Sequence, residues 1–246
     1  MTTLIRSLWM WLSAAALILF WFPLLCIIRL FDTNPVRFRT GRWFRRLGEA
    51  IVRANPAWHI HIADGESSKV RSACVVVSNH QSLVDIPIIS CLPWEMKWIA
   101  KAELFKIPLV GWMMRMAGDI PLDRQHRSGA PALLKARKYL QQGCPVMIFP
   151  EGTRSPDGEV HSFTDGAFRL AIKAQAPILP LAIEGSHSCL QKGSWKFGEP
   201  RDVFVKVLPP VETTGLSSQD SQSLRDRIRE MIADQVAEWK KEARKQ

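Results

Sequence analysis

The sequence has little cysteine and none of the spacings that usually bind zinc or build a disulfide framework. Its cysteines number five, an odd count, and they lie in apolar stretches without any C-x-x-C pair. The histidines other than His80 have no ligand spacing with acidic or thiol partners, so we expect no metal site. The thiols are predicted to stay reduced and to pack as small core residues, which indicates a cytosolic environment.

Acidic residues are also in deficit. The chain has 33 Lys and Arg against 23 Asp and Glu, a formal net charge of +10. Such an excess favours an anionic partner: nucleic acid, acidic lipid or a phosphorylated substrate. No nucleic-acid-binding module has its signature here, and many arginines lie beside an apolar run near the N-terminus. We therefore expect anionic membrane lipids as partners and no nucleic acid.

Charge is absent from residues 8–28, which read LWMWLSAAALILFWFPLLCII. As a helix of 21 residues this run would measure about 31 Å, close to the hydrocarbon thickness of a bilayer. A cleaved signal peptide is disfavoured, because the small residues 14–16 are followed by more of the apolar run. Pro23 would kink or break the helix. The run predicts a membrane anchor, either a bent span or a re-entrant hairpin in one leaflet.

Basic residues are concentrated after the apolar run, where six arginines lie between positions 29 and 46, whereas only Arg6 precedes the run. This asymmetry places the downstream chain in the cytoplasm, on the inner face of the membrane. Residues 37–54 mix arginines with Trp43, Phe44 and aliphatic residues at helical spacing. They predict a basic helix on the lipid surface, with a helix packed on the folded domain as the alternative. We assign residues 1–54 to the anchor and 55–246, after Asn55-Pro56, to a folded domain.

Short β-rich runs alternate with helical patterns in residues 55–246, without internal repeats. This alternation predicts an α/β sandwich with a mixed, partly parallel sheet. The predicted strands are 57–62, 74–78, 97–100, 145–149, 178–183 and 203–208. The predicted helices are 131–143, with Leu133, Leu134 and Leu140 opposite three cations and Gly143 as its cap, 167–175, and a long amphipathic helix near the C-terminus. Functional residues in such sheets gather at strand ends.

One strand end carries a conspicuous polar group, the stretch NHQSLVD after the run CVVVS. Ser82 and Asp85 have the spacing of a helix capping box, which explains those two residues but not Asn79 and His80. The alternative is catalytic: His80 acts as a general base, and Asp85 fixes its tautomer and stabilises the imidazolium. Positions five apart in one regular helix diverge by about 140°, so the pair can meet only if His80 precedes the helix.

Two further stretches add candidate ligand contacts. FPEGTRS, residues 149–155, directly follows another buried strand, and an ordinary turn would not require Glu151 and Arg154 there. In this stretch Gly152 permits close backbone approach to a ligand, and Thr153 adds a donor. GDIPLDRQHR, residues 118–127, contributes Arg124. Two arginines from separate loops could hold a phosphate group.

These stretches occur together in one known family. NHQSLVD, KAELFKIPLVGW, GDIPLDR, FPEGTRS and ILPLAI, within about residues 75–190, resemble in order and spacing the 1-acyl-sn-glycerol-3-phosphate acyltransferases. The resemblance implies an α/β sandwich with an active site near the membrane surface. It also implies His80 as catalytic base and Asp85 as its orienting carboxylate. The positions that match the family's substrate-binding blocks are Lys101, Arg124, Glu151, Gly152, Thr153, Arg154 and Pro180. One departure is Pro121, where the family usually has a bulky apolar residue.

The resemblance implies acyl transfer from a thioester, acyl-CoA or acyl carrier protein, to the sn-2 hydroxyl of 1-acyl-sn-glycerol-3-phosphate. The product would be phosphatidic acid, formed without a cofactor and without a covalent acyl-enzyme. Two alternatives remain: the same chemistry on another lysophospholipid or a lyso-aminolipid, and a non-catalytic adaptor on the membrane surface. A serine lipase or esterase is disfavoured, because the sequence has no G-x-S-x-G segment.

Overall fold

Seven strands form a single mixed sheet in the computed structural model, which describes residues 2–63, 73–123 and 129–243. The strand order is β1-β7-β6-β2-β5-β3-β4, and every neighbouring pair is parallel except β6 and β7. The mixed, partly parallel sheet predicted from the sequence is confirmed. The strands are β1 (Trp58–Ala63), β2 (Val75–Ser78), β3 (Lys97–Lys101), β4 (Ile120–Leu122), β5 (Val146–Ile148), β6 (Ile178–Glu184) and β7 (Arg201–Val207).

The centre of the sheet is β2, whose sequence VVVS is fully buried. A continuous run of β-branched residues suits a strand that is covered on both faces. The edge strand β4 was not predicted, because it has three residues and contains Pro121. A proline is tolerated at a sheet edge, where its missing N–H leaves no ladder bond unmade. The carboxyl ends of β2, β3, β4, β5 and β6 all lie at the same edge.

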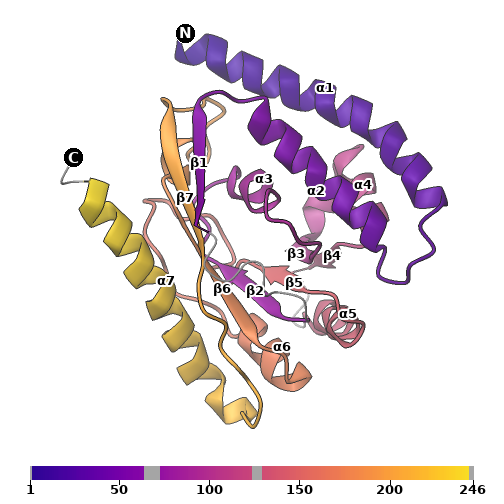
Figure 1. The fold of residues 1–246 in the computed structure, drawn as a ribbon, viewed down its shortest axis with the longest axis vertical. Helices are drawn as coiled ribbons and strands as arrows, with labels where there is room; N and C mark the ends of the chain where they lie inside the picture. The colour runs from indigo at the N-terminus through magenta and orange to yellow at the C-terminus, as the bar shows by residue number, and fades with distance from the viewer. Residues whose placement is uncertain (1, 64–72, 124–128, 244–246) are drawn as a thin grey trace.

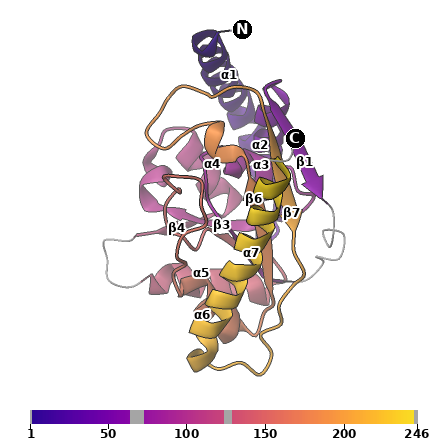
Figure 2. The same ribbon diagram turned by 90° about the vertical axis from the view of Figure 1, so that its left-hand side faces the viewer.

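Helices cover both faces of the sheet (Figures 1 and 2). One face packs against α5 (Ala130–Gln141), α6 (Gly166–Ala174) and α7 (Ser221–Ala243). The other packs against α2 (Phe38–Arg53), α3 (Asp85–Ile89) and α4 (Val110–Ala117), and α1 (Thr3–Leu30) lies outermost. The described residues also form the 3-10 turns η2 (Ala102–Lys106), η3 (Ser186–Ser188) and η4 (Ser218–Asp220).

The buried face of α5 differs from the predicted one. Leu134 is 61% exposed, whereas Ala136, Tyr139 and Leu140 are buried against the sheet. The three-leucine pattern therefore predicted the helix correctly and its face only in part. Two of the four buried positions, Ala132 and Ala136, are small and let α5 lie close to the strands. Gly143 follows the helix at φ 78°, a conformation that glycine adopts without strain, as expected of a C-terminal cap.

The N-terminal helix α1 is continuous through Pro23. The sequence predicted a kink or a break at this proline, and the break is wrong. Proline has no backbone N–H, so the carbonyl of Leu19 loses the hydrogen bond that residue 23 would normally donate. The side chain of Leu19 is 63% exposed, so this carbonyl lies on an exposed turn of the helix. The chain instead reverses in the short turn between α1 and α2, which pack side by side as a helical pair (Figure 1).

Two of the three aromatic side chains of α2 face α1, and the third, Phe38, is 50% exposed. Trp43 and Phe44 pack with Trp21 and Phe22 of α1, and the Nε1 of Trp21 donates to the carbonyl of Trp43 at 2.8 Å. The sequence predicted that this helix lies on the lipid surface with its aromatic face. The structure instead shows the alternative, a helix packed on the domain. Burying these rings between two helices removes more apolar surface from water than one-sided contact would.

A network of four buried charges joins α2 to the sheet. The guanidinium of Arg45 binds the carboxylate of Asp119, and its Nε lies 3.9 Å from Glu95. The Nζ of Lys97 donates to Glu95 at 2.7 Å. All four side chains are at most 4% exposed. Removing one partner would leave an uncompensated buried charge, so the network strongly constrains how α2 docks.

Candidate active site

The first part of the site is the loop between β2 and α3, which begins with Asn79 and His80. His80 precedes α3, as the catalytic interpretation required, and its Nδ1 lies 2.8 Å from Oδ2 of Asp85. Asp85 is the first residue of α3 and its side chain is fully buried, whereas that of His80 is 13% exposed. The strand end and the helix start thus bring the imidazole and carboxylate together.

Asp85 holds the loop as well as the imidazole. Its Oδ2 accepts the backbone N–H groups of Gln81 at 2.8 Å and Ser82 at 2.9 Å. The full capping box expected from Ser82 and Asp85 is not formed. The hydroxyl of Ser82 donates instead to the carbonyl of Leu190 at 2.6 Å. A carboxylate bound by two backbone donors has little freedom to turn, so Asp85 presents a fixed acceptor to His80.

The second part of the site is the FPEGTRS loop that follows β5. It holds His80 on three sides: the ring of Phe149 stacks on the imidazole, with centroids 3.9 Å apart and planes 14° apart. The carboxylate of Glu151 accepts the backbone N–H of His80 at 2.9 Å, and the N–H of Ser155 donates to its carbonyl at 2.7 Å. Because β2 and β5 are parallel neighbours, their following loops meet at the same edge.

Glu151 has an unusual electrostatic position. Burial raises its pKa above the ordinary glutamate value, while hydrogen bonds from the backbones of His80 and His161 oppose that shift. The side chain predicted to contact the acceptor therefore touches the backbone of the predicted base. Whether it also touches substrate stays a prediction.

An apolar groove of about 490 Å³ lies next to this pair of loops. Its polar end is formed by Glu151, Gly152 and Thr153. Its apolar wall comes from both sheet and helices: Ile99, Leu122, Leu133, Ile148, Phe149 and Ala167. Since Phe149 is shared between the groove and the His80 stack, the imidazole lies at the groove's edge. The lining suits an apolar chain.

The other predicted substrate contacts are placed unequally. Lys101 ends β3 and is exposed, with its Nζ 3.5 Å from Glu103. Thr153 is exposed and accepts a hydrogen bond from Lys192, which also donates to the carbonyl of Arg154. Pro180 is buried within β6, opposite Val77, away from the groove lining. Arg124 lies outside the described residues.

Asn79 supports the site in a way the sequence left unexplained. Its side-chain amide donates to the carbonyl of Ile183 at 2.8 Å and its oxygen accepts the N–H of Ile183 at 2.9 Å. The side chain thus extends the pairing of β2 and β6 past the end of β2. The two residues are more than a hundred positions apart in the chain. The only sign in the sequence that Asn79 has a role was its position directly before His80.

Gln81 also supports the loop. Its amide donates to the carbonyl of Gly158 and to Glu184, each at 2.8 Å, and Ser186 donates to its oxygen at 3.2 Å. One glutamine therefore joins three chain segments behind His80 and Asp85. Burial raises the pKa of Glu184, consistent with its place in this enclosed network.

Comparison with known sequences places the site in a family. The sequence model of the Acyltransferase family matches residues 59–184, which include His80, Asp85 and Glu151. The chain belongs to the Acyltransferase family. Among curated relatives of this acyltransferase-family chain, two chloroplastic proteins named 1-acyl-sn-glycerol-3-phosphate acyltransferase, from Brassica napus and Arabidopsis thaliana, are 39% identical over 139 residues and 34% identical over 186 residues. The alpha form from Mus musculus is 39% identical over 158 residues.

Coverage differs between these relatives and the known structures. The matches take in 56%, 75% and 63% of this chain but only 40%, 51% and 55% of the three relatives, so the chain spans about half of their length. The crystal structure of the 1-acyl-sn-glycerophosphate (LPA) acyltransferase PlsC from Thermotoga maritima is similar over 97% of this chain and 96% of its own, with a TM-score of 0.81 and 33% identity. The acyltransferase fold therefore includes the N-terminal helical pair.

Proposed function

We propose that this protein transfers an acyl chain from a thioester to the free hydroxyl of 1-acyl-sn-glycerol-3-phosphate, forming phosphatidic acid. The observation that carries the proposal is the His80–Asp85 pair, 2.8 Å apart at the edge of an apolar groove. The names of the similar proteins support the acceptor.

His80 supplies the base that an alcohol nucleophile requires. Its Nδ1–H donates to Asp85, which leaves Nε2 as the acceptor for the hydroxyl proton. As the C–O bond forms, the proton moves to Nε2, and the thioester sulfur leaves and takes a proton. Asp85 stabilises the imidazolium that forms in between. Proton removal by a positioned base contributes about 10²- to 10⁴-fold.

Substrate positioning falls to the groove and to cations near its polar end. The apolar wall would hold an acyl chain, and burying each methylene there contributes about 0.8 kcal/mol. Arg154 and Lys101, with Arg124 from the sequence pattern, would bind the acceptor's phosphate. Acyl-CoA and acyl carrier protein both remain as donors in this scheme, since both deliver a thioester.

The acceptor is an amphiphile, so we place the protein on the membrane through α1. This helix is long and apolar enough to cross a bilayer, yet it contacts the domain along its whole length. Arg6 binds Glu199 near one end, and Leu25 is fully buried near the other. We therefore propose that α1, 28 residues and about 42 Å long, stays packed on the domain instead of standing across the bilayer away from it.

The outward face of α1 fits a position within one leaflet. It exposes large apolar side chains along its length, with alanines between Leu12 and Leu19: Leu4, Ile5, Leu8, Leu12, Leu19, Phe20 and Ile27. Lipid contact on this face and domain contact on the other account for both halves of the helix. The arginine excess that follows α1 supports the cytoplasmic leaflet.

The test is an acyl-transfer assay on the purified full chain in mixed micelles. The acceptors are 1-acyl-sn-glycerol-3-phosphate, lysophosphatidylcholine, a lyso-aminolipid and glycerol 3-phosphate, each with acyl-CoA and with acyl carrier protein. We expect preference for the first acceptor, and a loss of about 10²-fold or more in His80→Ala. His59→Ala, an exposed histidine on β1, is the matched control and should retain activity. Preference for another acceptor would overturn the substrate, and unchanged transfer by His80→Ala would overturn the mechanism.

A further inference from the structure

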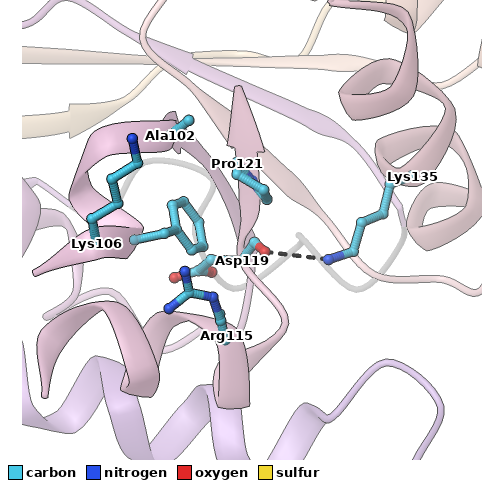
Figure 3. Close-up of a pocket in the computed structure, with 7 residues that line it drawn as sticks. Ala102, Lys106, Arg115, Asp119, Pro121 and Lys135 are labelled. Atoms are coloured by element: carbon cyan, nitrogen blue, oxygen red, sulfur yellow. Dashed lines mark hydrogen bonds between the residues drawn. The ribbon is translucent and has the colours of Figure 1, made fainter. Parts of the chain in front are cut away.

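A second pocket, on a different part of the molecule from the apolar groove, is rich in positive charge. It lies between η2, α4 and the edge strand β4 and has a volume of about 380 Å³ (Figure 3). Lys106, Arg115 and Lys135 supply its cations. The remaining lining residues are Ala102, Phe105, Asp119 and Pro121. We call these seven residues the cationic pocket.

The positive charge of this pocket is not neutralised by its one acidic residue. The carboxylate of Asp119 is already bound by Arg45 and by the backbone N–H of Trp98. The Nζ of Lys135 donates to the backbone carbonyl of Asp119 at 3.3 Å (Figure 3) and lies 5.6 Å from the ring centroid of Tyr139. Within the described part of the chain, no carboxylate forms an ion pair with Lys106, Arg115 or Lys135.

A further cation lies beside the pocket. The guanidinium of Arg37 donates to the carbonyl of Arg115. Burial lowers the pKa of Lys135, the charge of Arg37 lowers it further, and the charge of Asp119 opposes the shift in part, with a smaller lowering from Lys97. An anion bound in the pocket would relieve this repulsion.

The surroundings of the pocket are apolar and continue toward α1. Ile107 directly follows η2 and is 44% exposed. Trp112 lies on α4 and is 51% exposed. The ring of Trp112 contacts Phe22 of α1, with centroids 5.7 Å apart. Cations bordered by exposed aliphatic and aromatic side chains are the arrangement found where a protein meets the headgroup layer.

The cationic pocket is separate from the site of acyl transfer. Successive residues of a strand point to opposite faces of the sheet. In β4, Pro121 lines the cationic pocket and Leu122 lines the apolar groove. The pocket opens at the sheet edge formed by β4, and its lining shares no residue with that of the apolar groove. Acyl transfer by a variant of the pocket therefore tests whether the acceptor uses it.

We propose that the cationic pocket binds the phosphate of an anionic phospholipid in the leaflet that α1 contacts. The inference rests on the membrane placement in the proposed function. A lipid bound there would fix the rotation of the protein about α1 and hold the edge strands at a constant height above the headgroups. Arginine and lysine together suit a phosphate, and each adds roughly tenfold or less to the affinity for anionic membranes.

The experiment measures vesicle binding of the full chain by co-sedimentation at fixed ionic strength. One set of vesicles is phosphatidylcholine alone, and the other also contains about 20 mol% phosphatidylglycerol as the anionic lipid. The variant is Lys106→Gln/Arg115→Gln/Lys135→Gln. The charge-matched control is Arg137→Gln/Lys138→Gln/Lys173→Gln, exposed cations on α5 and α6 away from α1.

We expect the pocket variant to lose at least about tenfold in affinity for the anionic vesicles, the control less than about threefold, and neither to change binding to neutral vesicles. Equal losses in the two variants would mean a diffuse charge effect and overturn the pocket. Lys106→Gln alone, at a side chain with no hydrogen bond to the described residues, serves as a second variant if the triple one folds poorly, and should lose about threefold.

Two further arms separate the remaining outcomes. In the first arm, glycerol 3-phosphate is added as a competitor. If it displaces the wild type from anionic vesicles at a concentration on the order of millimolar, the pocket is a site for soluble phosphates and the lipid assignment is overturned. Acyl transfer by the pocket variant in detergent micelles should equal that of the wild type.

A wild type that fails to acylate 1-acyl-sn-glycerol-3-phosphate but keeps the pocket-dependent binding would overturn the proposed function alone. A wild type that binds neither vesicle would overturn the membrane placement and the pocket's lipid with it.

Discussion

Glu151 shows how one residue can match a substrate-binding motif and yet occupy another position. The resemblance implies that it binds the acceptor, whereas its carboxylate accepts the backbone N–H of His80 at 2.9 Å. A carboxylate with this contact holds the base in place. The two roles differ in which kinetic parameter they affect, because acceptor binding governs KM and placement of the base governs kcat.

We expect Glu151→Ala to lower kcat by about 10- to 100-fold and to change KM for the acceptor by less than about threefold. Glu151→Gln keeps an oxygen that accepts the His80 N–H, so it should recover most of the lost kcat. Steady-state kinetics over a range of acceptor concentrations checks both. A rise in KM with constant kcat in both variants would restore the acceptor role.

At the scale of elements, the docking of α2 depends on a glycine. A Cβ added to Gly41 would overlap the carboxylate of Glu95 and lie 2.6 Å from Nζ of Lys97. The helix therefore lies close above the buried charges because this position has no side chain. Any residue larger than glycine would push α2 outward or separate Glu95 from Lys97.

Gly41→Ala should lower the free energy of unfolding by about 2–4 kcal/mol, since it overpacks the interface and disturbs buried charges. Gly166→Ala is the matched control, because its Cβ would meet nothing within 4 Å at the start of α6. That control should be neutral or stabilising by up to about 1 kcal/mol. Chemical denaturation in detergent measures both, and equal stability of the two variants would show that α2 docks more loosely than the structure indicates.

At the scale of the whole molecule, α1 divides its surface between the domain and the surroundings. Its Trp9 and Trp11 donate to backbone carbonyls of the domain, at 3.0 and 2.8 Å, while Leu12, the residue after Trp11, is 68% exposed. Exposure of a whole row of large apolar residues along one helix marks a surface that another apolar phase covers.

Leu12→Gln should weaken binding to vesicles about tenfold or more, because it removes one leucine from the lipid-facing row. Leu134→Gln alters an equally exposed leucine on α5, 61% exposed and far from α1, and should leave vesicle binding unchanged. Co-sedimentation with neutral vesicles makes the comparison. Equal binding by the two variants would mean that the outward face of α1 does not enter the membrane.

The sequence alone determined much of this arrangement. Continuous β-branched runs predicted the central strands, helical periodicity predicted α5, α6 and α7, and their alternation predicted a mixed sheet with polar groups at strand ends. His80 and Asp85 could be paired in advance because they are five residues apart, and a local turn decides whether they meet. These features depend on short-range spacing, which a sequence states directly.

The tertiary structure decided what depends on contacts between distant segments. It decided that α2 turns its aromatic face to α1, that Asn79 binds Ile183 and that Glu151 reaches the backbone of His80. The edge strand β4, too short to show a period, and the exposure of Leu134 belong to the same group. A side chain's partner depends on strand order and register, which are fixed only when the whole core packs and which no local pattern encodes.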